Sequence, residues 1–476
     1  MSRAIFHVDI AVIGAGSGGL SVAAGAAQLG ASTVLIERAQ MGGDCLNTGC
    51  VPSKALLASA KAARWAGQQK LGIAYSAPQV DFAAVNRHVH EVIAAIAPND
   101  SVERFEGLGV NVIKGAARFE GPGEVSVGGM RIQARRFVVA TGSKAALPAI
   151  PGLEQVPYFT NETIFDNLEL PHHLVVIGGG PIGLEMAQAH RALGSQVTVL
   201  EAAHILPKDD PELVEVVRAR FAEDGIDIRE GVKITRIAQE SGAIVVVLAS
   251  PNGQEQRIEG SHLLVAAGRR PNVAGLDLEN AGISHGPAGI DVDARLRTSN
   301  RRVFAIGDVA GGPQFTHVAG YHAGIVIRNA LFRQPAKIDY RAVPWVTYTD
   351  PELAHVGLTE AHARASHGAD VTVLRWPYHE NDRAQAERKT DGLIKAVTTK
   401  SGKILGASIA GANAGELIQV WVLAIGQGLN VKALAGMIAP YPTLGEISKR
   451  AAGSFFTPKL FSPRTRKLVR FLSWFG

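Results

Sequence analysis

The chain has 476 residues, 46% of them hydrophobic, and a formal net charge of +5. This length suggests about three domains of ~150 residues each. The small net charge gives no reason to expect a nucleic-acid partner, and no run of about 18 or more apolar residues predicts a membrane span. A buried strand over Val8–Ile13 is predicted where a secretory signal would stand, so we expect a cytoplasmic protein.

A glycine-rich turn follows this first strand. Gly14-x-Gly16-x-x-Gly19 opens an alanine-rich helix, and a second strand leads to Glu37, 18 residues after Gly19. The glycines permit a tight turn and close approach of the backbone to a pyrophosphate, which the helix N-terminus attracts. Glu37 is placed to accept hydrogen bonds from the adenosine ribose. The segment predicts a dinucleotide-binding unit.

The only two cysteines, Cys45 and Cys50, come directly afterwards. Cys50 precedes a helical Ala/Leu run, and a thiol at a helix N-terminus has a lowered pKa. Lys54 lies one turn further on the same helix face. Two small buried side chains or half of a zinc site are the alternatives. Because stable disulfides are rare in a reducing cytoplasm, a redox-active thiol pair is favoured.

The glycine motif occurs a second time. Gly178-x-Gly180-x-x-Gly183 follows a predicted strand, and Glu201 ends the next strand, again 18 residues after the third glycine. Two copies in strand–turn–helix–strand context imply two dinucleotide cofactors. Electrons passing between them need a flavin and a nicotinamide. Glu201 would repel the 2′-phosphate of NADPH, which favours NADH as the reductant. Arg269 and Arg270 follow later in the same predicted domain, and because they could bind that phosphate, NADPH is not excluded.

At this point the chain resembles the FAD-dependent pyridine nucleotide–disulfide oxidoreductases, among them dihydrolipoamide dehydrogenase, glutathione reductase and mercuric reductase. The resemblance covers nearly the whole chain to about residue 455 and rests on the two glycine motifs, the cysteine segment and four further motifs: Ala140–Ser143, Ala267–Asn272, Phe304–Val309 and Tyr441–Glu446.

This resemblance implies an α/β fold with two Rossmann-like dinucleotide-binding domains, for FAD and NAD(P), and a C-terminal α+β dimerisation domain. The domain division that we expect is 1–150 for the first part of the FAD domain, 151–275 for the NAD(P) domain, 276–340 for the second part of the FAD domain, 341–455 for the dimerisation domain and 456–476 for a basic amphipathic tail.

The resemblance also implies roles for individual residues. Cys50 would be the thiol beside the flavin ring, Cys45 the thiol that meets the substrate, and Lys54 the partner of Glu185 near the reduced flavin. No resident metal site is expected. The expected cofactor-binding residues are Gly14, Gly16, Gly19, Glu37, Gly43, Thr48, Lys54, Ala117, Thr141, Gly142, Gly178, Gly180, Gly183, Glu201, Gly268, Asp308, His317 and Ala319.

The chain departs from the family pattern at Tyr441. Members that act on small disulfides carry His there, supplied by the partner subunit of a homodimer and backed by a Glu, retained here as Glu446. An unperturbed Tyr has a pKa of about 10 against about 6.5 for His, so Tyr441 is a poor general base. With a tyrosine at this position the chain resembles the mercuric reductases, but it lacks the pair of cysteines that those enzymes carry near the C-terminus. Pro181 replaces an aromatic residue that shields the flavin in many relatives.

The C-terminal tail predicts a helix that begins after Ser462, with Pro463 at its first position. Apolar residues recur at helical spacing between basic ones, as in helices that lie on anionic membranes, and packing on the partner subunit is the alternative. The apolar residues are Leu468, Phe471, Leu472 and Phe475, and the basic ones are Arg466, Lys467 and Arg470.

Three functions follow. The first is an enzyme that passes electrons from NAD(P)H through flavin and a Cys45–Cys50 disulfide to a thiol-reactive small molecule or metal ion. The second is a membrane-surface flavin reductase of quinone or oxygen with dispensable cysteines. The third is a non-enzymatic redox sensor or scaffold that binds FAD and NAD.

Overall fold

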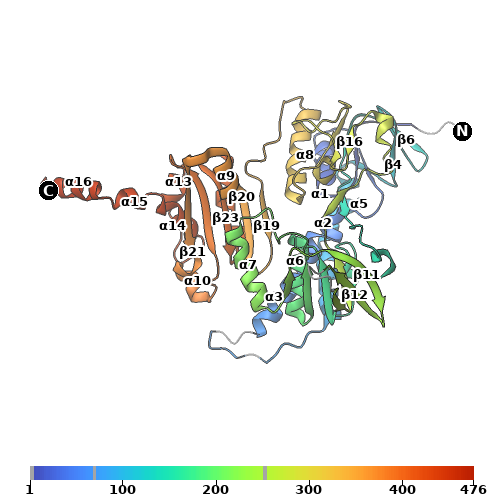
Figure 1. Cartoon of the computed structure of the whole chain (residues 1–476). Helices are drawn as coiled ribbons and strands as arrows, with labels where there is room; N and C mark the ends of the chain where they lie inside the picture. The colour runs from blue at the N-terminus through green and yellow to red at the C-terminus, as the bar shows by residue number, and fades with distance from the viewer. Residues whose placement is uncertain (1–4, 68–70, 75, 250–254, 476) are drawn as a thin grey trace.

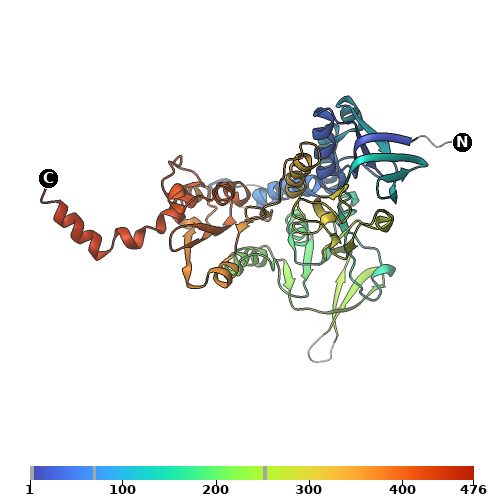
Figure 2. The same cartoon turned by 90° about the horizontal axis from the view of Figure 1, so that it is seen from above.

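A computed structural model describes residues 5–67, 71–74, 76–249 and 255–475. The N-terminal sheet lies at one side of the molecule, the green central sheets lie below it, and an orange C-terminal sheet stands apart from both (Figure 1). Seen from above, the C-terminal tail leaves this last sheet and points away from the rest of the chain (Figure 2).

The N-terminal sheet is built around the first predicted strand, β1 (Ile5–Ile13). Parallel pairing joins β3, β2, β1, β6 and β18, while β5 and β4 add antiparallel strands beside β6. Strand β18 thus returns to this sheet late in the chain. The bounds are β2 Thr33–Glu37, β3 Val110–Lys114, β4 Ala117–Gly121, β5 Glu124–Val127, β6 Met130–Val139 and β18 Val303–Ala305.

The second glycine motif belongs to a separate parallel sheet in the order β10-β9-β8-β14, which is followed by an antiparallel sheet, β11-β12-β13. Two short strands, β7 and β15, pair where the chain crosses between the first two sheets. The bounds are β7 Ser143–Ala145, β8 His173–Ile177, β9 Gln196–Leu200, β10 Asp227–Arg229, β11 Ile234–Glu240, β12 Ala243–Leu248, β13 Gln256–Gly260, β14 His262–Val265, β15 Arg269–Pro271, β16 His285–Gly286 and β17 Gly289–Ile290.

The C-terminal sheet is wholly antiparallel, in the order β19-β20-β23-β22-β21, with helices packed against it. Its strands are β19 Pro344–Thr347, β20 Glu352–Gly357, β21 Val371–Pro377, β22 Leu393–Thr399 and β23 Ile404–Gly411. Its helices are α9 Glu360–His367, α10 Asp382–Glu387, α11 Ala414–Leu417, α12 Gln419–Gly426, α13 Val431–Ala435 and α14 Glu446–Ser454. The three main sheets, namely the N-terminal sheet, the parallel sheet of the second glycine motif and the C-terminal sheet, agree with the predicted fold class.

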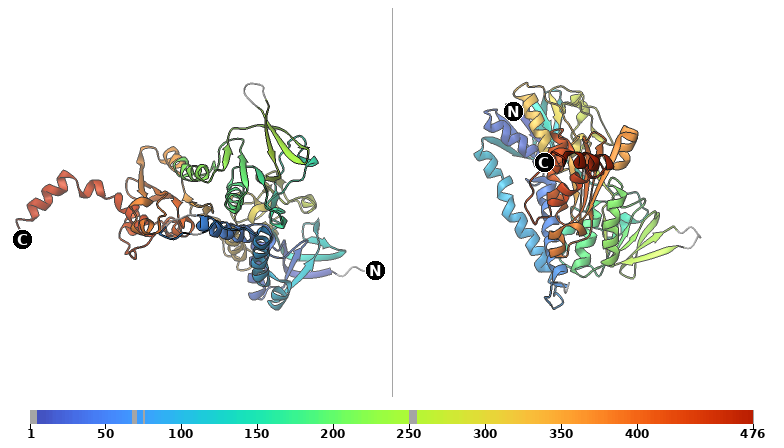
Figure 3. Two further views of the ribbon diagram at one scale, coloured as in Figure 1. Left: turned by 90° about the horizontal axis from the view of Figure 1, so that it is seen from below. Right: turned by 90° about the vertical axis from the view of Figure 1, so that its left-hand side faces the viewer.

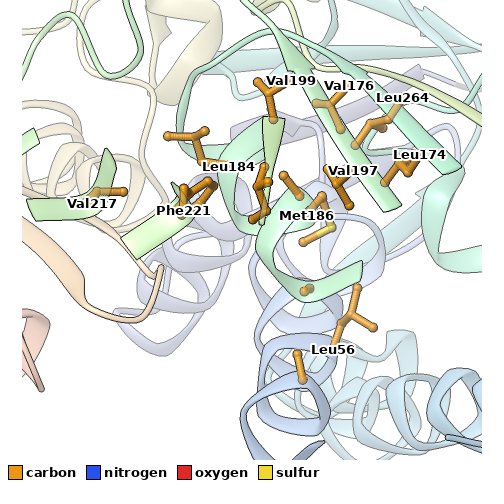
Figure 4. Close-up of a cluster of buried hydrophobic side chains, with 14 of the residues drawn as sticks. Leu56, Leu174, Val176, Leu184, Met186, Val197, Val199, Val217, Phe221 and Leu264 are labelled. Carbon is orange, nitrogen blue, oxygen red and sulfur yellow. The ribbon is translucent and has the colours of Figure 1, made fainter. Parts of the chain in front are cut away.

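Helices of the first two sheets carry the site. These are α1 Ser17–Gln28, α2 Gly43–Asn47, α3 Cys50–Gly67, α4 Phe82–Ile96, α5 Val102–Gly107, α6 Pro181–Leu193, α7 Pro211–Glu223 and α8 Thr316–Ala330. A buried apolar cluster ties α3 to α6 and to the second sheet. In Figure 4, Leu56 of α3 lies below Met186 of α6, and Leu184 faces the sheet residues Val197 and Val199. Because this core fixes α3 against α6, it also fixes the polar side chains at their cleft-facing ends.

The tail folds as α15 (Thr457–Leu460) and α16 (Pro463–Leu472). The predicted cap is present, since the Ser462 hydroxyl accepts a hydrogen bond from the backbone N–H of Thr465. Figure 3 shows the two helices extending beyond the C-terminal sheet. Within the described residues, no helix is long and apolar enough to cross a bilayer.

Candidate active site

A cleft of about 2500 Å³ runs between the three sheets. Both glycine loops, the cysteine segment and the start of α8 line it, and the C-terminal sheet closes one end through Tyr348 and its neighbours. Pockets for drug-sized ligands measure roughly 300–1,000 Å³, so this cleft has room for two extended dinucleotides.

The first glycine loop is shaped by close backbone contacts. Gly14 has a φ of +105°, and a Cβ there would lie 2.5 Å from the carbonyl oxygen of Ala140. A Cβ at Gly19 would lie 1.8 Å from the Gly14 carbonyl oxygen, so helix α1 can approach β1 only with glycine there. Gly16 is the N-cap of α1, and no side chain caps that helix. Its N-terminus therefore remains available to an anion in the cleft.

The second loop repeats this construction. Gly178 has a φ of +115° with its would-be Cβ 2.3 Å from the Ala266 carbonyl oxygen, and a Cβ at Gly183 would lie 2.0 Å from the Gly178 carbonyl oxygen. Gly180 caps α6 without a side-chain hydrogen bond, and Pro181 occupies the first helical position. Both loops fit the pyrophosphate of a dinucleotide for the same physical reason.

Each loop also holds its glutamate in the same way. The Glu37 carboxylate accepts hydrogen bonds from the backbone N–H groups of Ala15 (2.6 Å) and Ala39 (2.7 Å). The Glu201 carboxylate accepts them from Gly179 (2.7 Å) and Ala203 (2.9 Å). Both carboxylates line the cleft. The repeat found in the sequence is therefore a repeat in structure down to these contacts.

Cys45 lies in the short helix α2, and Cys50 is the first residue of α3, as the sequence predicts. Both are free thiols that line the cleft. The contact with Cys45, the Thr316 hydroxyl at 3.4 Å and the Lys54 ammonium together lower the pKa of Cys50 to about 6, although burial opposes this. The same contact and burial raise the pKa of Cys45. In the dithiol form, Cys50 is the thiolate and Cys45 keeps its proton.

Lys54 and Glu185 face each other across the α3–α6 contact. The Lys54 Nζ lies 2.6 Å from Glu185 Oε2, and Glu185 Oε1 accepts the backbone N–H of Tyr348 at 3.0 Å. The Lys54 Nζ also lies 4.3 Å from the centroid of the Tyr348 ring. The ammonium is held at the cleft wall by a buried carboxylate and an aromatic face. Sequence reasoning missed Tyr348 because nothing near it in the chain marks it.

Arg269, which the sequence places after the second glycine motif, has its side chain beside the cysteine segment. Its Nε donates to the Ser143 hydroxyl (2.7 Å), its Nη2 lies 3.2 Å from Asp44 Oδ1, and its side chain is only 13% exposed. Ser143 in turn donates to Asp308 at 2.5 Å. The guanidinium of Arg269 is thus engaged beside the cysteine segment, and the expectation that Arg269 and Arg270 do not exclude NADPH stays a prediction.

Tyr441 and Glu446 lie outside the chain's own cleft. Tyr441 is 69% exposed, and its hydroxyl donates to Asp382 Oδ2 at 3.0 Å. This hydrogen bond raises the pKa of Tyr441 above its ordinary value, so even less of the side chain is ionised near neutral pH and available to accept a proton. Glu446 begins α14. Asp382, 59 residues earlier in the chain, was not expected from the sequence.

The other predicted cofactor residues divide into two groups. Gly19 and Gly183 lie behind the loops, where they permit close helix–strand packing. The remainder line the cleft, namely Gly16, Gly43, Thr48, Ala117, Thr141, Gly142, Gly180, Gly268, Asp308, His317 and Ala319. Among the residues that the structure describes, no three His, Cys, Asp or Glu side chains gather as a metal site.

Comparison with known proteins gives a consistent result. Residues 8–323 match the model of the pyridine nucleotide-disulphide oxidoreductases, and residues 343–452 match the dimerisation domain of the same family. The mercuric reductase of Streptomyces lividans is 37% identical over 96% of this chain and 98% of its own length. The dihydrolipoyl dehydrogenase of Geobacillus stearothermophilus is 37% identical over 94% and 96%.

Solved structures show the same likeness. The HOCl-induced flavoprotein disulfide reductase RclA of Escherichia coli superposes with a TM-score of 0.85 at 30% identity, covering 94% of this chain and 99% of that one. It has also been solved as a Cu(II) complex. LpdA of Mycobacterium tuberculosis has the same TM-score of 0.85 at 27% identity.

Proposed function

The chain belongs to the pyridine nucleotide-disulphide oxidoreductases, and from this we propose that it carries electrons from NADH through Cys50 and Cys45 to a thiol-reactive acceptor. That it is a flavin-dependent oxidoreductase with a pyridine nucleotide substrate follows from the family. The observation that carries the finer proposal is the position of Cys50 beside Cys45, Thr316 and Lys54, which lower its pKa, in a cleft that both glycine loops share.

The first glycine loop and Glu37 fit FAD, and the second loop and Glu201 fit the nicotinamide nucleotide. When bound, FAD supplies the hydride acceptor and passes two electrons towards the disulfide. Reduction of the Cys45–Cys50 disulfide by two electrons and one proton leaves that proton on Cys45 and the negative charge on Cys50. Lys54, held by Glu185, places a positive charge beside the anionic groups that form during this step.

The dithiol then acts on the acceptor. Cys45 is the thiol proposed to meet it. As the disulfide re-forms, two electrons leave for one Hg(II) ion or for two Cu(II) ions, and the proton of Cys45 is released to solvent. A metal ion that prefers thiolates, such as Hg(II), needs no base to take a proton from a dithiol substrate. Tyr441, whose raised pKa keeps its hydroxyl protonated near neutral pH, therefore favours such an ion over lipoamide. Cu(II) joins Hg(II) as a candidate because of the complex solved for RclA.

A direct test compares the FAD-loaded protein with a Cys45→Ser variant. NADH is mixed with each under anaerobic conditions, and turnover is measured with Hg(II), Cu(II), lipoamide, glutathione disulfide and a soluble quinone. We expect the variant to lose turnover of metal ions and disulfides while its oxidised form shows a thiolate–flavin charge-transfer absorbance from Cys50. Full activity of Cys45→Ser would show that the cysteines are dispensable and would favour the quinone alternative.

We propose NADH rather than NADPH as the reductant. Glu201 presents its carboxylate at the end of β9, where a 2′-phosphate would be repelled, and Arg269 is engaged elsewhere. Comparing kcat/KM for the two nucleotides tests this. A preference for NADPH would contradict it.

The dimerisation domain supports a homodimer. We propose that Tyr441 and Glu446 reach the cleft of the partner subunit, since they lie outside their own. We also propose a cytoplasmic enzyme that can contact the inner face of the membrane through its tail, where a lipid-soluble quinone would be an alternative acceptor.

A further inference from the structure

The tail, residues 457–475, begins beyond the last residue matched by the family models. It extends away from the body of the molecule in Figures 1 and 2 and in the left view of Figure 3. Its large apolar side chains are all more than half exposed, from 53% for Phe471 to 80% for Trp474. They are Leu460, Phe461, Leu468, Val469, Phe471, Leu472, Trp474 and Phe475. The chain itself does not cover this surface.

The charge of the tail has one sign. Five basic residues lie in it, and no Asp or Glu follows Glu446 anywhere in the sequence. The basic residues are Lys459, Arg464, Arg466, Lys467 and Arg470. Around helix α16, at 100° per residue, Arg466, Lys467 and Arg470 fall together on one side.

The opposite side of α16 carries Leu468, Phe471 and Leu472, with Val469 at its edge and Arg464 at its N-terminal end. An aromatic cluster extends this side past the last helical residue. The Phe471 ring centroid lies 5.3 Å from that of Phe475 and 6.4 Å from that of Trp474. Aromatic rings with one apolar body and one polar edge are characteristic of the membrane–water interface.

We propose that the tail binds to the surface of an anionic lipid bilayer. Helix α16 would lie in the plane of the membrane interface, with its apolar side facing the hydrocarbon core. A cationic, acid-free polar side and an exposed aromatic end are what this surface selects. A second copy of this chain is the other candidate occupant, but it carries a net charge of +5 and offers no overall charge complement. The phosphate groups of anionic lipids offer one. In a homodimer, two tails would bind together and reinforce each other.

The test is co-sedimentation of the FAD-loaded full-length protein with vesicles of equal parts phosphatidylglycerol and phosphatidylcholine, and with phosphatidylcholine alone. We expect at least tenfold tighter binding to the anionic vesicles, weakened by salt, with a blue shift of Trp474 fluorescence that a Trp474→Phe variant loses. An apolar variant, Leu468→Gln with Phe471→Gln, and a charge variant, Arg466→Gln with Lys467→Gln and Arg470→Gln, should each lose at least tenfold in binding.

A matched control removes three exposed charges elsewhere, by Lys337→Gln, Lys400→Gln and Lys403→Gln, and should bind vesicles as the unchanged protein does. All variants should keep their FAD, their dimer mass and their NADH oxidation in solution, since the tail is remote from the cleft. Absence of anionic vesicle binding would overturn the proposal. So would a tail variant that dissociates the dimer, because that result assigns the tail to the partner subunit.

Discussion

The chemistry of the site depends on which of two neighbouring thiols holds the negative charge. Cys50 is the first residue of α3. Its thiol is surrounded by Cys45, Thr316 and Lys54, and these groups lower its pKa to about 6. The pKa of Cys45 moves the other way. Since a thiolate can only accept hydrogen bonds, the Thr316 hydroxyl donates to Cys50 in this form. The asymmetry supports the proposal that electrons enter at Cys50 and that Cys45 retains the proton.

Thr316→Val tests this asymmetry. The Cys50 pKa is lowered in the folded protein, so the thiolate is present above about pH 6 and is lost as the pH falls through that value. Removing a hydrogen bond to a charged group costs about 1.5–3 kcal/mol, so we expect the midpoint to rise by about one pH unit or more. The readout is the pH dependence of the thiolate–flavin absorbance. Thr316→Ser keeps the hydroxyl and should leave the midpoint unchanged.

Tyr441 determines whether a general base is present where we propose that the acceptor meets Cys45. With its hydroxyl bound to Asp382 and its pKa raised, it cannot take a proton from a dithiol substrate near neutral pH. Tyr441→His should therefore raise dihydrolipoamide turnover by about tenfold or more, with a new dependence on a group of pKa about 6.5. Tyr441→Phe should not. Equal turnover in the two variants would show that residue 441 takes no part in proton transfer.

At the scale of elements, the two strand–turn–helix units could be predicted because each is local. Tight backbone contacts at Gly14, Gly19 and their counterparts require glycine, so the spacing itself carries the structure. The position of Cys50 at a helix start was predictable for the same reason. The partners of that cysteine were not, since Thr316 lies 266 residues away. Tyr348 and Arg269 also reach the site only through packing between sheets, which leaves no local pattern.

Two glycines of the second loop should respond differently to alanine. A Cβ at Gly183 would meet the Gly178 carbonyl oxygen, whereas a Cβ at Gly180 meets no heavy atom within 4 Å. Gly183→Ala should lower stability by about 1–3 kcal/mol through overpacking, seen as a lower Tm. Gly180→Ala should keep the Tm but raise the KM for NADH, because its methyl group projects at the nucleotide loop. A similar Tm loss in both would contradict a packing role specific to Gly183.

On the scale of the whole molecule, the exposed apolar surface of the C-terminal domain points to a dimer. Ile438 is 94% exposed and Leu423 61% exposed, in the region matched by the dimerisation model. Ile438→Asp should reduce the mass in solution from that of a dimer to about that of one 50.1 kDa chain and abolish acceptor turnover while FAD is retained. The matched control, Leu168→Asp, changes a residue that is 62% exposed outside this domain and should leave the dimer intact. A dimer that survives Ile438→Asp would place the interface elsewhere.

The central claim is that the Cys45–Cys50 pair stores electrons between flavin and acceptor. Anaerobic titration of the oxidised, FAD-loaded protein with NADH measures this storage directly. We predict two equivalents of NADH per FAD for full reduction of the unchanged protein, since flavin and disulfide each take two electrons. We predict one equivalent for the Cys45→Ser variant. One equivalent for both proteins would contradict the account, because the cysteines would then hold no electrons.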